Sequence, residues 1–338
     1  MKGYLWLVLL LAVFLLLIPL PALPKANPSG ATGPAAAPST TPPPAATTIP
    51  DAPPAQPMYR ILCGDTVVSL PQREFLIRTL AMEMPALYHE EALKAQAVAA
   101  YTYYTRRRNQ QAEQADPALK GADFVTPHSN FPQDYTEEKL RQRWGEQYTQ
   151  NYQKICAAVD AVAGQVITYD GALIDACFHA VSNGSTEDAA TVWGSKVPYL
   201  QAVASAGDTT ASGYASERTL TPDEVRAALS KAGIQTTLPA DPAAWFGSPT
   251  ISAAGTVASQ PIGDATLPGT KVRQIFGLRS ATFTVTYADG RFTFAVRGYG
   301  HGVGMSQHGA DYLAKQGYTY RQILEHYYVG AKVEQESK

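Results

Sequence analysis

The composition of the chain changes sharply near residue 58. Residues 25–57 consist mainly of Pro, Ala, Thr, Ser and Gly, with almost no aliphatic side chain larger than that of alanine. Such a segment cannot bury enough apolar surface to offset the entropy lost on ordering. The three consecutive prolines at 42–44 favour an extended chain. We therefore interpret residues 25–57 as a disordered linker and expect a folded domain at residues 58–338.

The N-terminal residues are strongly apolar. No charged side chain occurs at residues 4–18, and more apolar residues follow to residue 23. About 20 predominantly apolar residues are needed to cross a bilayer. A cleaved secretory signal is the alternative, but Pro21, Pro24 and Lys25 spoil its cleavage site. We predict that residues 1–24 are a transmembrane signal anchor, with Lys2 inside. The protein would then be a single-pass cell-membrane protein with its folded domain on the extracytoplasmic side.

Charge and cysteine content narrow the functional classes. The formal net charge is −2 and the sequence contains no basic block, which argues against a nucleic-acid partner. The 45% apolar content is enough for a sizeable core. The cysteines Cys63, Cys156 and Cys177 are too few for a disulfide scaffold. One disulfide with a spare thiol, or three small buried side chains, remain the two interpretations.

The expected elements combine helices with antiparallel hairpins. Alanine-rich residues 91–106 give the clearest helix, and Thr221 with Glu224 forms the capping-box pattern of another helix. The absence of regular βαβ alternation predicts an α+β fold, with helices and antiparallel hairpins around a substrate cleft. The expected helices are residues 71–82, 91–106, 136–158 and 221–231. The expected strands are residues 60–68, 166–169 paired with 174–179, and 283–287 paired with 291–296.

Residues 297–310 are rich in glycine and histidine. They include His301, Ser306, Gln307 and His308, and they follow an alternating strand at 292–296. Glycine lets a polar ligand approach the backbone, so this segment is typical of the wall of a site. A glycine-rich turn carrying surface histidines is the alternative interpretation.

Glu83 is a candidate general acid. It lies at the expected exit of a helix, between Met82 and Met84 and just before Pro85. An apolar setting raises the pKa of a carboxyl group because it disfavours the charged form, and a raised pKa suits an acid catalyst near neutral pH. A solvated surface glutamate is the alternative.

Cys177 and His179 are a second candidate pair. Residues two apart on a strand lie side by side, and their spacing does not match the usual zinc pairs. We rank a Cys-His hydrolase dyad below a structural role for these residues.

Several of these segments together resemble the stage II sporulation protein D family. They are Glu83-Met-Pro, the helix Glu-Ala-Leu-Lys-Ala-Gln-Ala-Val-Ala-Ala at 91–100, Phe178-His179, Val-Pro-Tyr-Leu at 197–200, residues 269–280, and Gly-His-Gly-Val-Gly-Met-Ser-Gln-His-Gly-Ala at 300–310. The resemblance runs from about residue 60 to 332, in order and at the spacing of the family. Because several independent motifs agree, it is highly specific.

The resemblance implies a peptidoglycan lytic transglycosylase that acts during engulfment in sporulation. Its substrate would be glycan strands already stripped of stem peptides by an amidase, and its partners an amidase and membrane proteins of the engulfment machinery. The family's catalytic acid corresponds to Glu83, which would cleave the MurNAc-GlcNAc bond and leave 1,6-anhydro-MurNAc ends. Ordinary glycosidases need two carboxylates, but an internal hydroxyl nucleophile lets one glutamate perform both proton transfers. Expected substrate-binding residues are Tyr101, His179, Tyr199, His301, Ser306, Gln307 and His308.

The chain departs from the family pattern at three places. Tyr101 stands where the family commonly has an arginine assigned to substrate or glutamate positioning, and Arg106 is a possible replacement. The loop at 123–133 holds one histidine and no cysteine, whereas some relatives bind zinc there, so we expect no metal and no other cofactor. His308 replaces a tyrosine of many relatives and keeps a flat hydrogen-bonding side chain.

Two rival functions follow from the same residues. The first is a non-enzymatic peptidoglycan-binding protein or amidase enhancer, which related sequences are also described as being and which the exchange at Tyr101 favours. The second is a zinc or Cys-His hydrolase acting on stem peptides, ranked last because the ligand spacing is missing.

Overall fold

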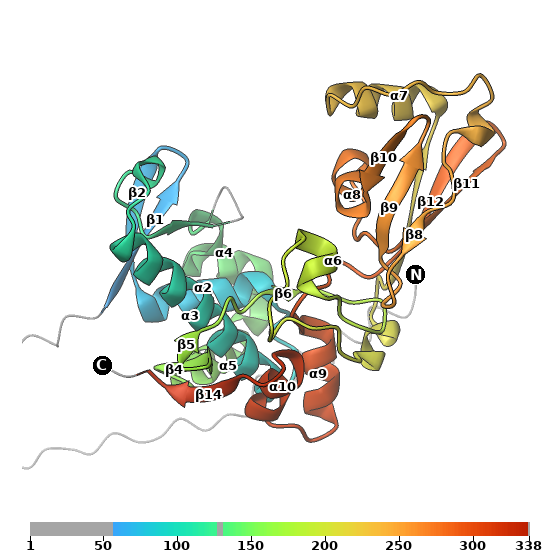
Figure 1. Cartoon of the computed structure of the whole chain (residues 1–338). Helices are drawn as coiled ribbons and strands as arrows, with labels where there is room; N and C mark the ends of the chain where they lie inside the picture. The colour runs from blue at the N-terminus through green and yellow to red at the C-terminus, as the bar shows by residue number, and fades with distance from the viewer. Residues whose placement is uncertain (1–56, 127–130, 337–338) are drawn as a thin grey trace, which may run out of the picture. The chain divides into compact units, whose positions relative to one another are not determined.

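A computed structural model of the chain describes residues 57–126 and 131–336. The predicted anchor and all but the last residue of the predicted linker lie outside these residues, as does His128. Within the described ranges, no helix combines the length and apolar character needed to span a bilayer. The described residues form one compact unit of mixed α and β structure, as predicted, shown in Figure 1.

Helix α3 (Glu90–Glu113) is the centre of the main core. Its alanines Ala92, Ala95 and Ala99 have no exposed surface. A helix that is apolar on most sides is buried by its neighbours, and small side chains let those neighbours approach. The predicted helix at 91–106 is therefore confirmed, and it continues to Glu113. Among the elements packed against α3 are α2 (Gln72–Glu83), α5 (Tyr148–Ala161), α9 (Gln307–Lys315), α10 (Tyr320–Tyr327) and β4 (Gln165–Tyr169).

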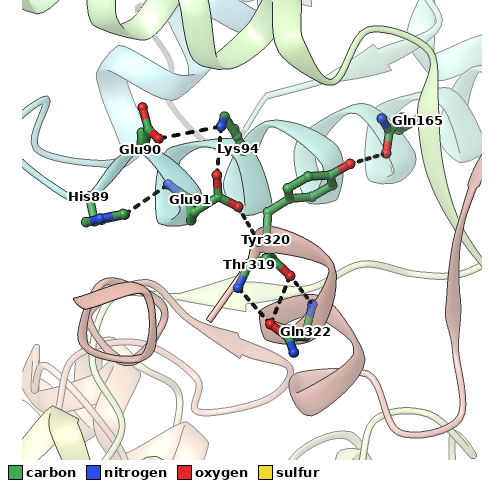
Figure 2. Close-up of polar contacts among 8 residues, drawn as sticks. All are labelled: His89, Glu90, Glu91, Lys94, Gln165, Thr319, Tyr320 and Gln322. Carbon is green, nitrogen blue, oxygen red and sulfur yellow. Dashed lines mark hydrogen bonds and ion pairs between the residues drawn. The ribbon is translucent and has the colours of Figure 1, made fainter. Parts of the chain in front are cut away.

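Glu91 joins the beginnings of α3 and α10, which are far apart in the chain (Figure 2). One carboxylate oxygen accepts a hydrogen bond from Lys94 Nζ at 2.7 Å, and the other accepts from the Tyr320 backbone N–H at 2.7 Å. Burial alone would raise the pKa of Glu91, but these two hydrogen bonds outweigh it and lower the pKa. Tyr320 Oη donates to Gln165 Oε1 at 2.8 Å, which connects the same helix end to β4.

Two predicted elements were wrong because a glycine interrupts each. Residues 60–68 form a hairpin of β1 (Met58–Cys63) and β2 (Thr66–Pro71) that turns at Gly64, where φ is +58°. The predicted helix 136–158 is divided into α4 (Glu137–Trp144) and α5, because Gly145 has φ of +52°. Positive φ is the conformation that favours glycine. The predicted helix 71–82 is confirmed as α2, with Glu83 as its last residue.

The predicted hairpin around Asp170-Gly171 is confirmed only in part. β4 pairs with β5 (Ala172–Leu173), but residues 174–177 form no strand. The next strand, β6 (Phe178–His179), instead pairs in parallel with β13 (Met305–Ser306). The remaining strands of this core are β3 (Phe124–Val125), beside β1, and β14 (Lys332–Gln335), beside β4.

Between β6 and β13 the chain builds a second hydrophobic core. The rings of Trp245, Phe292 and Phe294 are fully or almost fully buried in it. The predicted hairpin at 283–296 and the predicted capping box of Thr221 and Glu224 are both confirmed here. Helix α6 (Ala189–Trp193) lies in this part of the chain but packs against the main core. The other elements of this region are β7 (Ala215–Leu220), α7 (Pro222–Lys231), β8 (Thr250–Ile251), β9 (Val257–Ile262), β10 (Ala265–Pro268), α8 (Gly269–Phe276), β11 (Phe283–Ala288) and β12 (Arg291–Arg297).

The contact of Glu91 with α10 gives a testable prediction. Replacing Glu91 by alanine leaves the Tyr320 N–H and the Lys94 ammonium without their acceptor, so the free energy of unfolding should fall by about 1–3 kcal/mol. Glu91→Gln should cost less, because its amide oxygen still accepts from Tyr320. Glu90→Ala is the matched control: this neighbour is 65% exposed and lies 3.9 Å from Lys94, so its loss should cost at most about 0.5 kcal/mol. Equal losses in urea unfolding for Glu91→Ala and Glu90→Ala would contradict the prediction.

Candidate active site

A cleft of about 700 Å³ contains Glu83. The ends of α2 and β3, the middle of α3, the approach to β6 and the end of α6 all contribute to its wall. Its polar and aromatic lining includes Glu83, Tyr103, Arg107, Asp175, Trp193 and His301. The cleft therefore combines carboxyl groups, one guanidinium group and flat rings.

Glu83 is held at the end of α2 by a side chain from α9. Gln307 Nε2 donates a hydrogen bond to Glu83 Oε2 at 3.2 Å, and the same amide lies 3.5 Å from Gln96 Oε1. Gln307 is 5% exposed and Gln96 is completely buried, so both amides are packed inside the protein. The predicted raised pKa of Glu83 stays a prediction, whereas the partly buried position beside the buried Met84 is observed.

The glycine-rich segment reaches this position by packing tightly on β6. Gly300 and Gly304 have φ of +122° and +73°. A β-carbon at Gly304 would collide with the carbonyl of Cys177, and one at Gly300 would collide with the Cβ of His179. The glycines thus permit the parallel pairing of β6 with β13, which sets the start of α9 and Gln307.

His179 and His301 are neighbouring rings that burial keeps neutral near pH 7. The centroids of the two rings are 5.7 Å apart. The ring of Trp193, at the end of α6, has its centroid 5.4 Å from that of His301. Burial, assisted by the other histidine, lowers the pKa of His179 to about 3. Burial and the nearby Arg273 lower the pKa of His301 to about 4. His301 lines the cleft, whereas His179 is 4% exposed and its Nδ1 pairs with the Val303 carbonyl at 3.2 Å.

Ser306 and His308 lie on either side of Gln307 but have different surroundings. Ser306 is completely buried; its Oγ donates to Asp208 Oδ1 at 2.7 Å and accepts from the Gly309 N–H at 3.2 Å as the N-cap of α9. His308 lies 3.3 Å from the Tyr88 hydroxyl and 3.4 Å from Thr210 Oγ1. Neither side chain lines the cleft of Glu83.

Tyr101 and Tyr199 also lie outside the lining of this cleft. Tyr101 donates a hydrogen bond to Glu336 and lines a separate hollow with Gln72 and Ala97. The exchange at this position therefore affects a surface next to Glu336 and not the wall beside Glu83. Tyr199 stands behind the wall, where its hydroxyl accepts from the Asp175 backbone N–H at 2.9 Å.

Sequence reasoning missed several residues of the cleft, among them an exposed tryptophan, a second carboxyl group and a cation. Trp193 is 47% exposed at the end of α6, Asp175 is a second carboxyl group, and Arg107 lies over the ring of Tyr103 at 4.2 Å. The i,i+4 spacing of Tyr103 and Arg107 was a possible signal for the last of these, but the predicted helix ended at residue 106 and α3 continues to Glu113. No comparable pattern marks Asp175 or Trp193, because both lie in short or irregular segments.

All three cysteines are free thiols. Burial, with the carboxylate of Asp175, raises the pKa of Cys177 to about 12, so this thiol stays protonated at neutral pH and is a poor nucleophile. His179 Nδ1 pairs with the Val303 carbonyl and its Nε2 has no hydrogen-bond partner among the described residues, so the ring makes no hydrogen bond to Cys177. Over residues 57–126 and 131–336, no group of three or more His, Cys, Asp or Glu side chains is arranged to hold a metal ion.

Comparison with known proteins identifies the family. The family model described as stage II sporulation protein matches residues 64–169. Stage II sporulation protein D of Bacillus amyloliquefaciens is 36% identical over 289 residues, which are 85% of this chain and 80% of that protein. The chain belongs to the stage II sporulation protein D family. The family member of Bacillus subtilis is also 36% identical, over 287 residues. A Bacillus subtilis protein named amidase enhancer is 28% identical over 297 residues, which are 73% of this chain and 38% of that protein.

We predict that the buried His179 makes this family member less stable in acid. Because the folded-state pKa is about 3 and the unfolded value about 6.5, the unfolded state binds more protons below pH 6.5 and stability is lost as the pH falls. Between pH 7.5 and 5.0 the loss from His179 is about 2 kcal/mol. His179→Asn, whose amide can still donate to Val303, should remove that part of the pH dependence in unfolding experiments. Between pH 7.5 and 9.0 both proteins should respond alike; an unchanged acid response of the variant would refute the assignment.

Proposed function

We propose that this protein is a peptidoglycan lytic transglycosylase that uses Glu83 as both acid and base. The observation that carries the proposal is the position of Glu83: a partly buried carboxyl group in a cleft, hydrogen-bonded to Gln307 of the glycine-rich family motif. Membership of the stage II sporulation protein D family supports a role in remodelling the cell wall during engulfment. We also propose that residues 1–24 anchor the protein in the cell membrane and that an amidase and membrane proteins are its partners.

The proposed reaction consumes no water. The Glu83 carboxyl group gives its proton to the oxygen that joins C1 of MurNAc to GlcNAc, and the C1–O bond breaks. The resulting carboxylate then takes the proton of the MurNAc 6-hydroxyl while O6 attacks C1. The products are a 1,6-anhydro-MurNAc end and a GlcNAc end with a free 4-hydroxyl, and Glu83 is protonated again. Trp193 and His301 present flat rings on which a sugar can lie.

Product analysis of Glu83→Gln tests the proposal. Purified residues 58–338 should convert denuded glycan strands to 1,6-anhydro ends, detected by mass spectrometry. Glu83→Gln cannot transfer the proton and should be slower by a factor of about 10² to 10⁴. Glu90→Gln, which changes an exposed glutamate on the neighbouring helix, should keep full activity. Unchanged cleavage by Glu83→Gln would reject the mechanism.

Asp175 separates this mechanism from ordinary hydrolysis. A hydrolase needs a second carboxylate as nucleophile or water activator, and Asp175 is another carboxyl group in the cleft. If Glu83 performs both transfers, Asp175→Asn should still form anhydro ends. If the parent protein instead forms reducing ends without the anhydro bond, and Asp175→Asn forms none, the protein is a two-carboxylate hydrolase.

Gln307 is a positioning residue in the same mechanism. Gln307→Met keeps the volume of the side chain but removes the donor to Glu83, so kcat should fall about tenfold with little change in KM. The unfolding midpoint should be reported beside the kinetics. A rise in KM alone would show that Gln307 binds sugar and does not orient Glu83.

An amidase enhancer is the second candidate function. The observation that favours it is the similarity to the Bacillus subtilis protein of that name. Glycan binding without cleavage, combined with faster turnover of an added amidase, would support this candidate over the first.

A further inference from the structure

Arg107 makes no direct ion pair with a carboxylate among the described residues, although Glu83 and Asp175 line the same cleft. Its Nε atom is buried and has no hydrogen-bond partner, and the residues 57–126 and 131–336 hold no carboxylate in an ion pair with its guanidinium. The guanidinium carbon lies over the ring of Tyr103, 4.2 Å from its centroid. A cation over an aromatic face keeps N–H groups available for hydrogen bonds to a ligand. A buried donor without an acceptor needs an explanation, and a ligand is one.

Arg107 and Glu83 belong to the same cleft. Both line it, and both act on the buried phenol of Tyr104: burial is the largest cause of its raised pKa, the charge of Glu83 raises it further and that of Arg107 lowers it. When a ligand lies in the cleft with the bond to be cleaved at Glu83, its substituents next to that bond therefore lie near Arg107. An anionic substituent, and in particular a planar carboxylate, matches the two-pronged donor edge of a guanidinium.

The proposed substrate has such a substituent. Each MurNAc ring carries a lactyl ether at C3, on the same ring as the C1 atom that reacts. When the stem peptide is attached, the lactyl group ends in a neutral amide. Once the peptide has been removed, the same group ends in a free carboxylate.

We propose that Arg107 binds the lactyl carboxylate of MurNAc and thereby selects glycan strands that have lost their stem peptides. The inference rests on the proposed function, because it assumes that the cleft holds MurNAc. It adds a chemical basis for substrate choice: the cleft recognises a charge that appears only after the peptide is gone. Arg107 is thus a specificity residue, and the proton transfers remain with Glu83.

The test compares two substrates that differ only in this charge. One is the denuded strand with free lactyl carboxylates; the other is the same strand with the carboxylates converted to methylamides, which copies the amide but not the bulk of a stem peptide. The protein should cleave the free-acid strand with a kcat/KM roughly 10- to 100-fold higher. Arg107→Met should cleave the two strands equally, at the rate at which the parent protein cleaves the methylamide strand. Arg107→Lys should keep part of the preference, because it retains charge but not the planar fork.

Arg108→Met is the matched control. This neighbour on α3 lies 3.8 Å from Glu336 and near the ring of Tyr59, and it does not line the cleft. It should keep the full preference. If Arg107→Met lowers cleavage of both strands equally and the preference survives, Arg107 does not read the carboxylate. If the parent protein forms anhydro ends from both strands at the same rate, this inference fails and the proposed function stands.

Binding measurements test the role of Arg107 separately from the proposed reaction. The Glu83→Gln variant should bind free-acid strands more tightly than methylamide strands, and adding Arg107→Met should abolish that difference. If the Glu83→Gln variant shows this binding preference but the parent protein forms no anhydro ends from either strand, the role of Arg107 is supported and the proposed reaction is rejected. Equal binding of both strands would overturn the role of Arg107.

Discussion

The parallel pairing of β6 with β13 is the contact on which the candidate site depends. It sets Met305 beside Phe178 and Ser306 beside His179, although these strands are far apart in the chain. Only a backbone without β-carbons at residues 300 and 304 can come this close to β6. Gln307 follows the paired strand directly and so reaches Glu83, while His301 precedes it and faces the cleft. A short ladder thus joins the family motif to a carboxyl group on α2.

The surroundings of the cleft keep most of its titratable side chains uncharged. Burial lowers the pKa values of His179 and His301 and raises that of Cys177, so all three are neutral near pH 7. Arg107 is the cation among the lining residues, and Glu83 and Asp175 are the carboxyl groups. A wall of this kind suits a largely neutral carbohydrate. Its rings can lie on flat side chains, and each of its few charged groups can bind a single charged side chain. The wall does not suit a polyanion, in agreement with the lack of basic blocks in the sequence.

Sequence reasoning found local features better than long-range contacts. The alanine-rich helix, the Thr221 capping box and the hairpin turn at 289–290 depend on neighbouring residues, and all are observed. The division at Gly145 and the hairpin at Gly64 were missed because a glycine inside a periodic pattern does not reveal the sign of φ. Ser306 was expected to bind substrate, yet it caps α9 and pairs with buried Asp208. Its partner comes from a remote segment, which no local pattern can indicate.

Tyr101 shows why the face of a helix matters more than proximity in sequence. Successive residues of an α-helix advance by about 100°, so positions 101 and 107 point in directions about 120° apart. Tyr101 faces Glu336 and Arg107 faces the cleft of Glu83. If the family has an arginine at position 101, as the resemblance implies, its replacement by tyrosine does not remove positive charge from the cleft, since Arg107 supplies it from another face of α3. The exchange expected at Tyr101 thus gives less support to a non-enzymatic role than the sequence alone suggests, and the proposed enzyme differs from an enhancer in the proton transfers that we propose for Glu83.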